Sequence, residues 1–102
     1  MIYFGRHPNQ YGDKTDRFLV HQIQTTFNDA VKTPDYHFYE VIEKMFDVLY
    51  ECDAGVFRPY NDRQVDKVTF CHMSMMFGLL RPVYIICSDG SITRLLMKPL
   101  HE

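Results

Sequence analysis

One stretch of the sequence, residues 34–55, constrains the fold more than any other, because helical periodicity and helix-end signals agree within it. Pro34 directly after Thr33 is typical of a helix start, with Thr33 as the N-cap, and Gly55 is typical of a helix end. We therefore predict an amphipathic helix here. Its apolar residues recur three or four positions apart and would form the buried face: Phe38, Val41, Ile42, Met45, Phe46, Leu49 and Cys52.

The opposite face of this predicted helix is acidic and rich in tyrosine. Residues 34–57 contain six acids and one lysine, so this segment carries a charge of −5. Tyrosine is enriched at protein interfaces because it offers a large contact area with few rotamers. The pattern predicts a site for a protein with a basic surface, the alternative being an ordinary solvated helix face. The predicted site consists of Tyr36, Tyr39, Glu40, Glu43, Asp47, Tyr50 and Glu51.

Composition narrows the class of protein further. A chain of 102 residues with 46% apolar and 15% aromatic residues has enough material for one compact domain, residues 1–102. The net charge of −2 lacks the basic excess that is typical of general nucleic-acid binders. Three widely spaced cysteines without a signal peptide favour free thiols in the cytoplasm. No apolar run approaches the length of a membrane span.

The N-terminal third predicts a short strand and a second helix. Met1 to Phe4 is a short apolar run that suits a strand. After a polar loop, Thr15 or Asp16 would cap a helix with Leu19, Ile23 and Phe27 on its buried side. This helix would end near Lys32. Because the link to the helix at residues 34–55 is so short, we predict that the two helices form an antiparallel αα-hairpin.

The C-terminal half predicts a third helix and a β-hairpin. Residues 64–77 suit a helix better than a strand, with Asn61 and Gln64 as a capping pair. Asp89-Gly90 lies between two apolar runs and is a strong hairpin signal. The predicted pairs are Cys87 with Ile92, Ile85 with Arg94, and Val83 with Leu96. Helices early and strands late favour an α+β fold, with two or three helices packed on a small antiparallel sheet built around this hairpin.

Candidate chemistry is sparse. Cys71, His72, Met75 and Met76 would suit a soft metal such as Cu(I), but a buried helix with Met filling gaps is the simpler interpretation. No nucleophile or phosphate-binding motif is present, and Cys52 and Cys87 lie in apolar stretches typical of structural burial. We therefore predict no metal, no cofactor and no enzymatic activity.

These patterns predict a small non-enzymatic intracellular regulator or inhibitor. A protein of phage or viral type could place its acidic helix face in the phosphate-binding groove of a host nucleic-acid-processing enzyme. Changing Glu40, Glu43 and Asp47 to Lys should abolish partner capture in a pull-down and leave the fold intact. Retained capture would contradict this prediction.

Two alternatives stay open besides a small enzyme or enzyme subunit, which activity lost on mutation of His7 or Cys71 without unfolding would support. The protein could bind nucleic acid, in which case its affinity should fall steeply with salt. The residues for this role would be Arg6, Lys14, Arg17, Arg94 and Lys98. Self-association to a homodimer is the second alternative, because a sheet face with Tyr84, Ile86 and Leu95 would be too apolar to leave in water.

Overall fold

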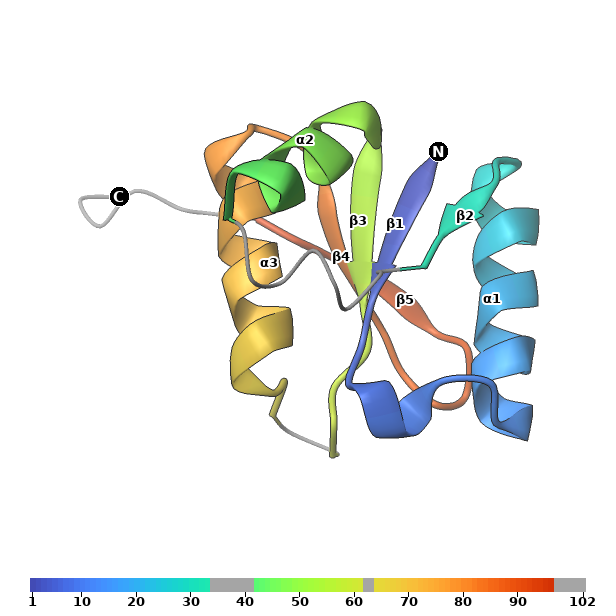
Figure 1. The fold of residues 1–102 in the computed structure, drawn as a ribbon. Coiled ribbons are helices and arrows are strands. Elements are labelled where there is room, and N and C mark those ends of the chain that lie inside the picture. The colour runs from blue at the N-terminus through green and yellow to red at the C-terminus, as the bar shows by residue number, and fades with distance from the viewer. Residues whose placement is uncertain (34–41, 62–63, 97–102) are drawn as a thin grey trace.

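The computed structural model describes residues 1–33, 42–61 and 64–96, and these residues form an open α/β sheet with helices on both faces (Figure 1). The strand order is β2-β1-β3-β4-β5, and every neighbouring pair is parallel except β4–β5. The elements in chain order are β1 (Ile2–Gly5), the 3₁₀ helix η1 (Pro8–Gln10), α1 (Lys14–Phe27), β2 (Val31–Lys32), α2 (Ile42–Glu51), β3 (Ala54–Phe57), α3 (Lys67–Gly78), β4 (Val83–Ile86) and β5 (Ile92–Leu95).

The sheet separates two apolar cores. Successive side chains of a strand point to opposite faces. On one face Ile2, Phe4 and Val56 pack against α1 in a core with Leu19 and Ile23. On the other face α2 and α3 cover the sheet (Figure 1). This second core contains Tyr3, Met45, Leu49, Cys52, Phe57, Met73, Met76 and Val83.

Two glycines let the central strands approach a large aromatic side chain. Gly5 of β1 pairs with Phe57 of β3, and Gly55 lies two residues before Phe57 on the same face. A Cβ atom on Gly5 would lie 2.5 Å from Phe57 Cδ1, and one on Gly55 would lie 2.6 Å from Phe57 Cε2. Gly55 is therefore a strand residue that makes room for an aromatic ring, and the prediction that it ends a helix is wrong.

The predicted α+β fold is wrong because two parallel strands were missed. The run Ala54–Phe57 forms β3 in the middle of the sheet, whereas the helix predicted at residues 34–55 would end within this run and no strand is predicted there. Val31–Lys32 forms β2, whereas these residues were assigned to the end of a helix. Both strands are short, and β3, which is buried on both faces, shows no alternation of polar and apolar residues. The correct class is α/β, with only the C-terminal strand pair antiparallel.

The predicted αα-hairpin is also wrong. Helix α1 begins after its N-cap Asp13 and ends at Phe27, because Asn28 takes the left-handed conformation with φ of 50°. The chain then enters β2, so α1 and α2 are separated by a strand and lie on opposite faces of the sheet (Figure 1). The described part of α2 covers Ile42–Glu51, and the predicted helix start at Pro34 lies outside the described residues.

The third helix is confirmed, with a different cap. Helix α3 covers Lys67–Gly78, within which the sequence favoured helix over strand. Its N-cap is Asp66, whose carboxylate accepts a hydrogen bond of 3.2 Å from the Thr69 backbone N–H. The predicted capping residue Asn61 does accept a hydrogen bond from the Gln64 N–H, but it does so ahead of the helix.

The C-terminal hairpin is confirmed, but its register is shifted by one residue. Ile86 pairs with Ile92 and Val83 pairs with Leu95, because the loop contains five residues rather than four. A shift of one residue moves a side chain to the other face of the sheet. Leu95 therefore packs against the α2–α3 core, whereas Ile86 and Tyr84 lie on the α1 side. The predicted single exposed face of these three residues does not exist, since Ile86 is fully buried.

Candidate functional site

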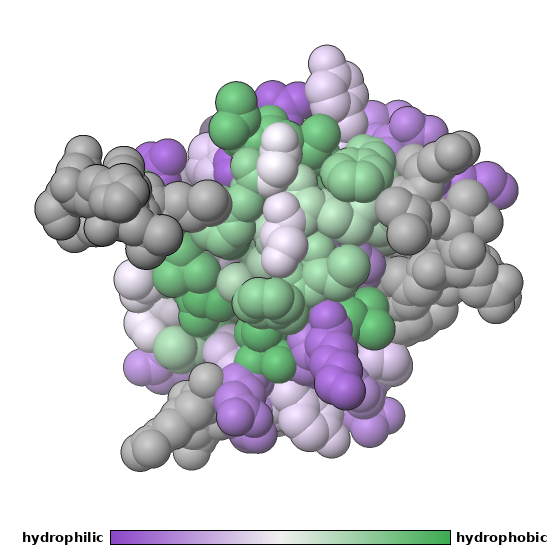
Figure 2. Space-filling model, turned by 90° about the vertical axis from the view of Figure 1, so that its left-hand side faces the viewer, coloured by the Kyte–Doolittle hydropathy of each residue, from purple (hydrophilic) through white to green (hydrophobic). Residues whose placement is uncertain are grey.

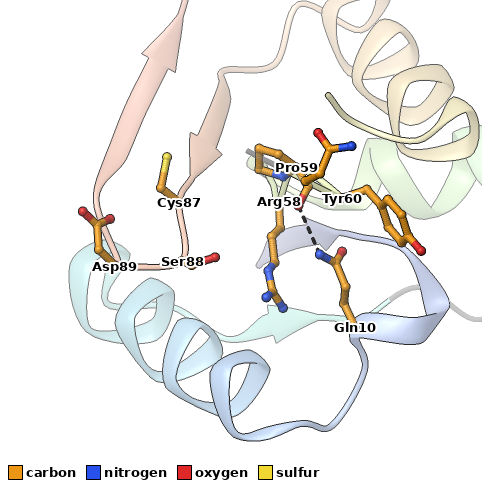
Figure 3. A pocket seen from close by; sticks show the side chains of 8 residues that line it. Gln10, Arg58, Pro59, Tyr60, Cys87, Ser88 and Asp89 are labelled. Atoms are coloured by element: carbon orange, nitrogen blue, oxygen red, sulfur yellow. Dashed lines mark hydrogen bonds between the residues drawn. The ribbon is translucent and has the colours of Figure 1, made fainter. Parts of the chain in front are cut away.

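The carboxyl ends of the parallel strands β1, β3 and β4 meet at one edge of the sheet. After β1 the chain crosses to β2 on one side, while β3 lies on the other side of β1. In open α/β sheets, ligands bind in the crevice outside the carboxyl ends of the strands, next to such a change of direction. A pocket of about 320 Å³ lies at this edge, and it is lined by Gln10, Arg58, Pro59, Tyr60, Asn61, Cys87, Ser88 and Asp89 (Figure 3).

Arg58 is the most buried charged residue of this pocket. It directly follows β3, and its backbone N–H donates a hydrogen bond of 2.9 Å to the Gly5 carbonyl, which extends the β1–β3 pairing. The residue is 9% exposed. Among the residues that the structure describes, its buried Nε and Nη1 atoms have no hydrogen-bond partner. A guanidinium cannot lose its charge, and a buried unpaired charge is costly. Arg58 therefore has donors available for an anionic group in the pocket.

The residues on either side of Arg58 form two walls. In Figure 3 the Arg58 side chain lies between Gln10 and the turn that contains Ser88. Gln10 is held in place, because its Nε2 donates to the Pro59 carbonyl at 3.1 Å and its Oε1 accepts from the His7 N–H at 3.1 Å. The Tyr60 ring packs 4.6 Å from the ring of His7 and is 49% exposed, so it presents an aromatic surface beside the pocket. Ser88 adds an exposed hydroxyl group from the other wall.

The β4–β5 turn that supplies the second wall is held by its own hydrogen bonds. The Cys87 N–H donates to the Ser91 carbonyl, and the Gly90 N–H donates to the Cys87 carbonyl, both at 2.9 Å. The Asp89 carboxylate accepts from the Ser91 N–H at 2.9 Å and from the Ser91 hydroxyl at 2.7 Å. These two hydrogen bonds lower the pKa of Asp89, so it is ionised at neutral pH.

Cys87 is exposed in this turn, and the prediction that it is structurally buried is wrong. The reason is that β4 ends one residue earlier, at Ile86. Cys52 is buried as predicted, and burial raises the pKa of its thiol. Reactive thiols have a lowered pKa, so Cys52 suits a structural role.

The basic residues predicted to contact nucleic acid are spread over the molecule. Arg6 is 4% exposed and donates to Asp16 from Nε at 2.7 Å and from Nη2 at 2.9 Å. Lys14 and Arg17 are exposed in the first turns of α1. Arg94 is exposed on β5 but pairs with Tyr84, near the start of β4 and away from the carboxyl edge. Lys98 lies outside the described residues.

Part of the predicted acidic helix face can be placed. Asp47, Tyr50 and Glu51 are exposed on α2, and Tyr50 is 66% exposed. Arg81 lies over the Tyr50 ring at 5.1 Å and donates to the Tyr50 carbonyl at 3.0 Å, which ties this end of α2 to the segment after α3. Tyr36, Tyr39 and Glu40 lie outside the described residues, and the side chain of Glu43 is likewise not described.

The side chains of the Cys71–Met76 segment point in different directions. Cys71 is exposed, whereas His72 is buried and its Nδ1 lies 3.0 Å from the Tyr3 hydroxyl. Burial lowers the pKa of His72 to about 4, so its ring is neutral at neutral pH. Within the described parts of the chain, no three His, Cys, Asp or Glu side chains are grouped closely enough to hold a metal ion.

The sequence analysis missed Arg58 because it predicts no strand before this residue. The available signal was positional: an arginine directly after a short apolar run, Ala54–Phe57. Once that run is recognised as a parallel strand, the residue after it falls at the ligand-binding edge. Likewise, Ser88 and Asp89 could have been placed at this edge only if β4 had been recognised as parallel to β3.

A comparison with models of known protein families finds no match, and no curated protein is significantly similar in sequence. None of the helices within residues 1–33, 42–61 and 64–96 is long and apolar enough to cross a membrane. The feature of this chain that points to a function is a buried arginine in a pocket at the carboxyl edge of an open α/β sheet.

Proposed function

We propose that the protein binds a small molecule through an anionic group, and that Arg58 is the principal ligand of that group. The observation that carries this proposal is the Arg58 side chain, which is 9% exposed and has buried Nε and Nη1 atoms without a described partner. A carboxylate or phosphate group matches the geometry of a guanidinium and forms strong charge-assisted hydrogen bonds with it. The volume of about 320 Å³ exceeds the size of a simple ion and falls within the range of small-ligand pockets.

The other lining groups limit the charge of the ligand. Asp89 lines the same pocket and is ionised at neutral pH, so it opposes a second or third negative charge near the turn. Ser88 and Tyr60 contribute hydroxyl groups that both donate and accept hydrogen bonds. A ligand with one anionic group and a polar body fits this set better than a polyanion such as nucleic acid.

The proposal concerns binding rather than catalysis. Two nucleophile types line the pocket, the Cys87 thiol and the Ser88 hydroxyl. Nucleophilic catalysis needs a base within hydrogen-bond reach of the nucleophile. Among the described residues, no hydrogen bond joins either group to a histidine or a carboxylate. Loss of binding, and not loss of a reaction rate, is therefore the appropriate test.

The test measures anion-dependent stability in the wild type and in Arg58→Gln. Sulfate, phosphate and acetate are titrated at constant ionic strength, and the free energy of unfolding is obtained from urea denaturation. A ligand that binds only the folded state raises this free energy by about 2.7 kcal/mol when its concentration is a hundred times Kd. We expect the rise in the wild type and its loss in Arg58→Gln.

Arg17→Gln is the matched control, because Arg17 is an exposed arginine on α1. It removes the same charge without touching the pocket, and it corrects for the general stabilisation of proteins by sulfate. Equal anion-dependent stabilisation in all three proteins would contradict the proposal. Chemical-shift changes at Ser88 and Tyr60 on addition of the anion would localise binding to this pocket.

The predicted protein-binding regulator is the second candidate function. The exposed Tyr50, flanked by the exposed acids Asp47 and Glu51 on α2, supports it. The cytoplasmic location likewise stays a prediction, supported by the three free cysteines.

A further inference from the structure

Helix α3 is apolar on the side that faces away from the sheet as well as on the side that faces it. Thr69, His72, Met73 and Met76 are buried against the molecule. The opposite stripe also lacks charged residues between the first turn and the end of the helix, and it consists of Phe70, Cys71, Ser74, Phe77 and Gly78. A helix that is apolar all round is normally covered on both sides. Figure 2 shows that hydrophobic and neutral residues fill the centre of this face of the molecule, with hydrophilic residues around it.

The exposed apolar area on this face is large for a small protein. Phe70 is 60% exposed, Leu80 just after the helix is 91% exposed, and Leu96 is 68% exposed. Phe77, Leu80 and Leu96 line one pocket together with Arg81 and Arg94, so this surface continues from α3 to the end of β5 with two arginines among its apolar residues. If each free side chain of this size exposes about 200 Å², Phe70, Leu80 and Leu96 alone contribute roughly 400 Å².

This area is close to what one subunit contributes to a stable homodimer. A standard interface buries about 800 Å² per partner, and in homodimers about 65% of it is apolar, which corresponds to roughly 500 Å². Phe77 and Cys71 supply the remainder beyond the three residues above. We propose that a second copy of this chain covers the face, with the α3 helices packed antiparallel around a two-fold axis at Ser74.

The shape of the helix surface favours a second copy of the same chain. Phe70 and Gly78 lie four residues before and four residues after Ser74. In an antiparallel pair, Phe70 of each copy therefore lies over Gly78 of the other, and the large side chain fills the space left by the small one. No atom lies within 4 Å of a Cβ built on Gly78, so that space is open. A two-fold interface must be self-complementary in this way.

The residue on the proposed axis is suited to close approach. The Ser74 hydroxyl donates to the Phe70 carbonyl at 3.0 Å, so its polar group is satisfied within the helix. Small residues allow helices to pack at the short end of the usual distance of about 8–10 Å. Lys67 is exposed at one end of the face, where its long side chain can reach water. At the other end the Arg81 side chain is held against Tyr50 of α2.

Sedimentation equilibrium tests the dimer and locates its interface. We expect the wild type to pass from monomer to dimer with rising concentration. Phe70→Glu and Gly78→Gln should each raise the dimer Kd roughly tenfold or more, because one buries a charge and the other fills the space for Phe70. Gly78 is outside the left-handed region and faces open space, so Gly78→Gln should leave the monomer fold unchanged by circular dichroism. Thr25→Gln on α1 is the control.

Cross-linking tests the position of the axis. Ser74→Cys and the control Thr25→Cys are compared in a background with Cys71→Ser and Cys87→Ser. The two sites are matched, since Thr25 is also exposed and donates its hydroxyl to the carbonyl four residues earlier. Mild oxidation should link Ser74→Cys into a disulfide dimer several times faster than Thr25→Cys. A wild type that stays monomeric at high concentration, or equal cross-linking at both sites, would overturn the proposal, and neither result bears on anion binding at Arg58.

Discussion

Two arginines at the same edge of the sheet have opposite surroundings. Arg6 and Arg58 directly follow Gly5 and Phe57, which are paired across β1 and β3. Both are more than nine-tenths buried, at 4% and 9% exposure. Arg6 is fully engaged: it binds both carboxylate oxygens of Asp16 and donates from Nη1 to the Phe4 carbonyl at 2.8 Å. Arg58 has buried donors with no partner among the described residues.

The two arginines therefore differ in role: the charge of Arg6 is part of the fold, whereas the charge of Arg58 is available to a ligand. The Arg6 guanidinium also lies 4.1 Å from the centre of the Phe4 ring and 4.4 Å from that of Tyr11, so packing and hydrogen bonds fix it together. Such a charge is compensated within the fold and has little left to offer an incoming anion. Arg58 occupies the equivalent position on the next strand, where the neighbouring groups line a pocket instead of closing around it.

Removal of the partner of Arg6 should have the largest effect on stability. Asp16→Asn leaves Arg6 buried with an unpaired charge, and loss of one partner of a buried ion pair costs about 3–5 kcal/mol. Urea denaturation at pH 7 measures the change in the free energy of unfolding. The double variant Arg6→Met with Asp16→Leu removes both charges and should recover much of the loss. A loss below about 1 kcal/mol in Asp16→Asn would contradict the structural role of this pair.

The sequence alone indicates the elements with strong local signals. The periodicity of residues 64–77 was sufficient for α3, although its predicted cap was wrong, and Asp89-Gly90 was sufficient for the hairpin. The sequence did not indicate β2 or β3, because Val31–Lys32 and Ala54–Phe57 are too short to show the alternation of polar and apolar residues that is typical of a strand. Their strand conformation depends on pairing with β1, which is remote in sequence. Because these strand pairings were missed, the predicted fold class was wrong, although most of the predicted helices and strands were correct.

The candidate site depended on the same missed pairings. Gln10, Arg58 and Ser88 come from three distant segments, and only the parallel order β1-β3-β4 brings them to one pocket. The sequence predicts Arg6, and not Arg58, as a nucleic-acid-binding residue. Composition cannot distinguish the two, since the difference lies in Asp16, ten residues after Arg6, which turns inward from α1.

A third buried ionisable group, His72, is accommodated by losing its charge. Burial beside the Tyr3 hydroxyl lowers the pKa of His72 from 6.5 to about 4 in the folded protein. Between these two pH values the unfolded chain binds a proton that the folded protein does not, so stability falls as pH falls. We expect a loss of about 2 kcal/mol between pH 7 and pH 5, measured by urea denaturation.

His72→Gln is the control for this pH dependence. It should lower the stability at pH 7, because the cavity and the hydrogen bond with Tyr3 change, but it should flatten the profile between pH 7 and pH 5. An unchanged slope in the variant would assign the pH dependence to other groups. The chain contains five histidines and the ordinary pKa of histidine lies in this range, so only the difference in slope between the wild type and His72→Gln is assigned to His72.

Arg58→Met should have the smallest effect on stability, and it is the sharpest test of the difference between Arg6 and Arg58. In buffer without oxyanions the variant removes a buried charge that has no described partner and replaces it with an apolar side chain of similar length. The free energy of unfolding should change by less than about 1 kcal/mol, or increase, because an uncompensated buried charge opposes folding. A loss of about 3 kcal/mol, as expected for Asp16→Asn, would mean that Arg58 has an internal partner like Arg6. A near-zero change together with loss of the anion effect would show that this arginine is kept for a ligand, since it contributes nothing to the fold that contains it.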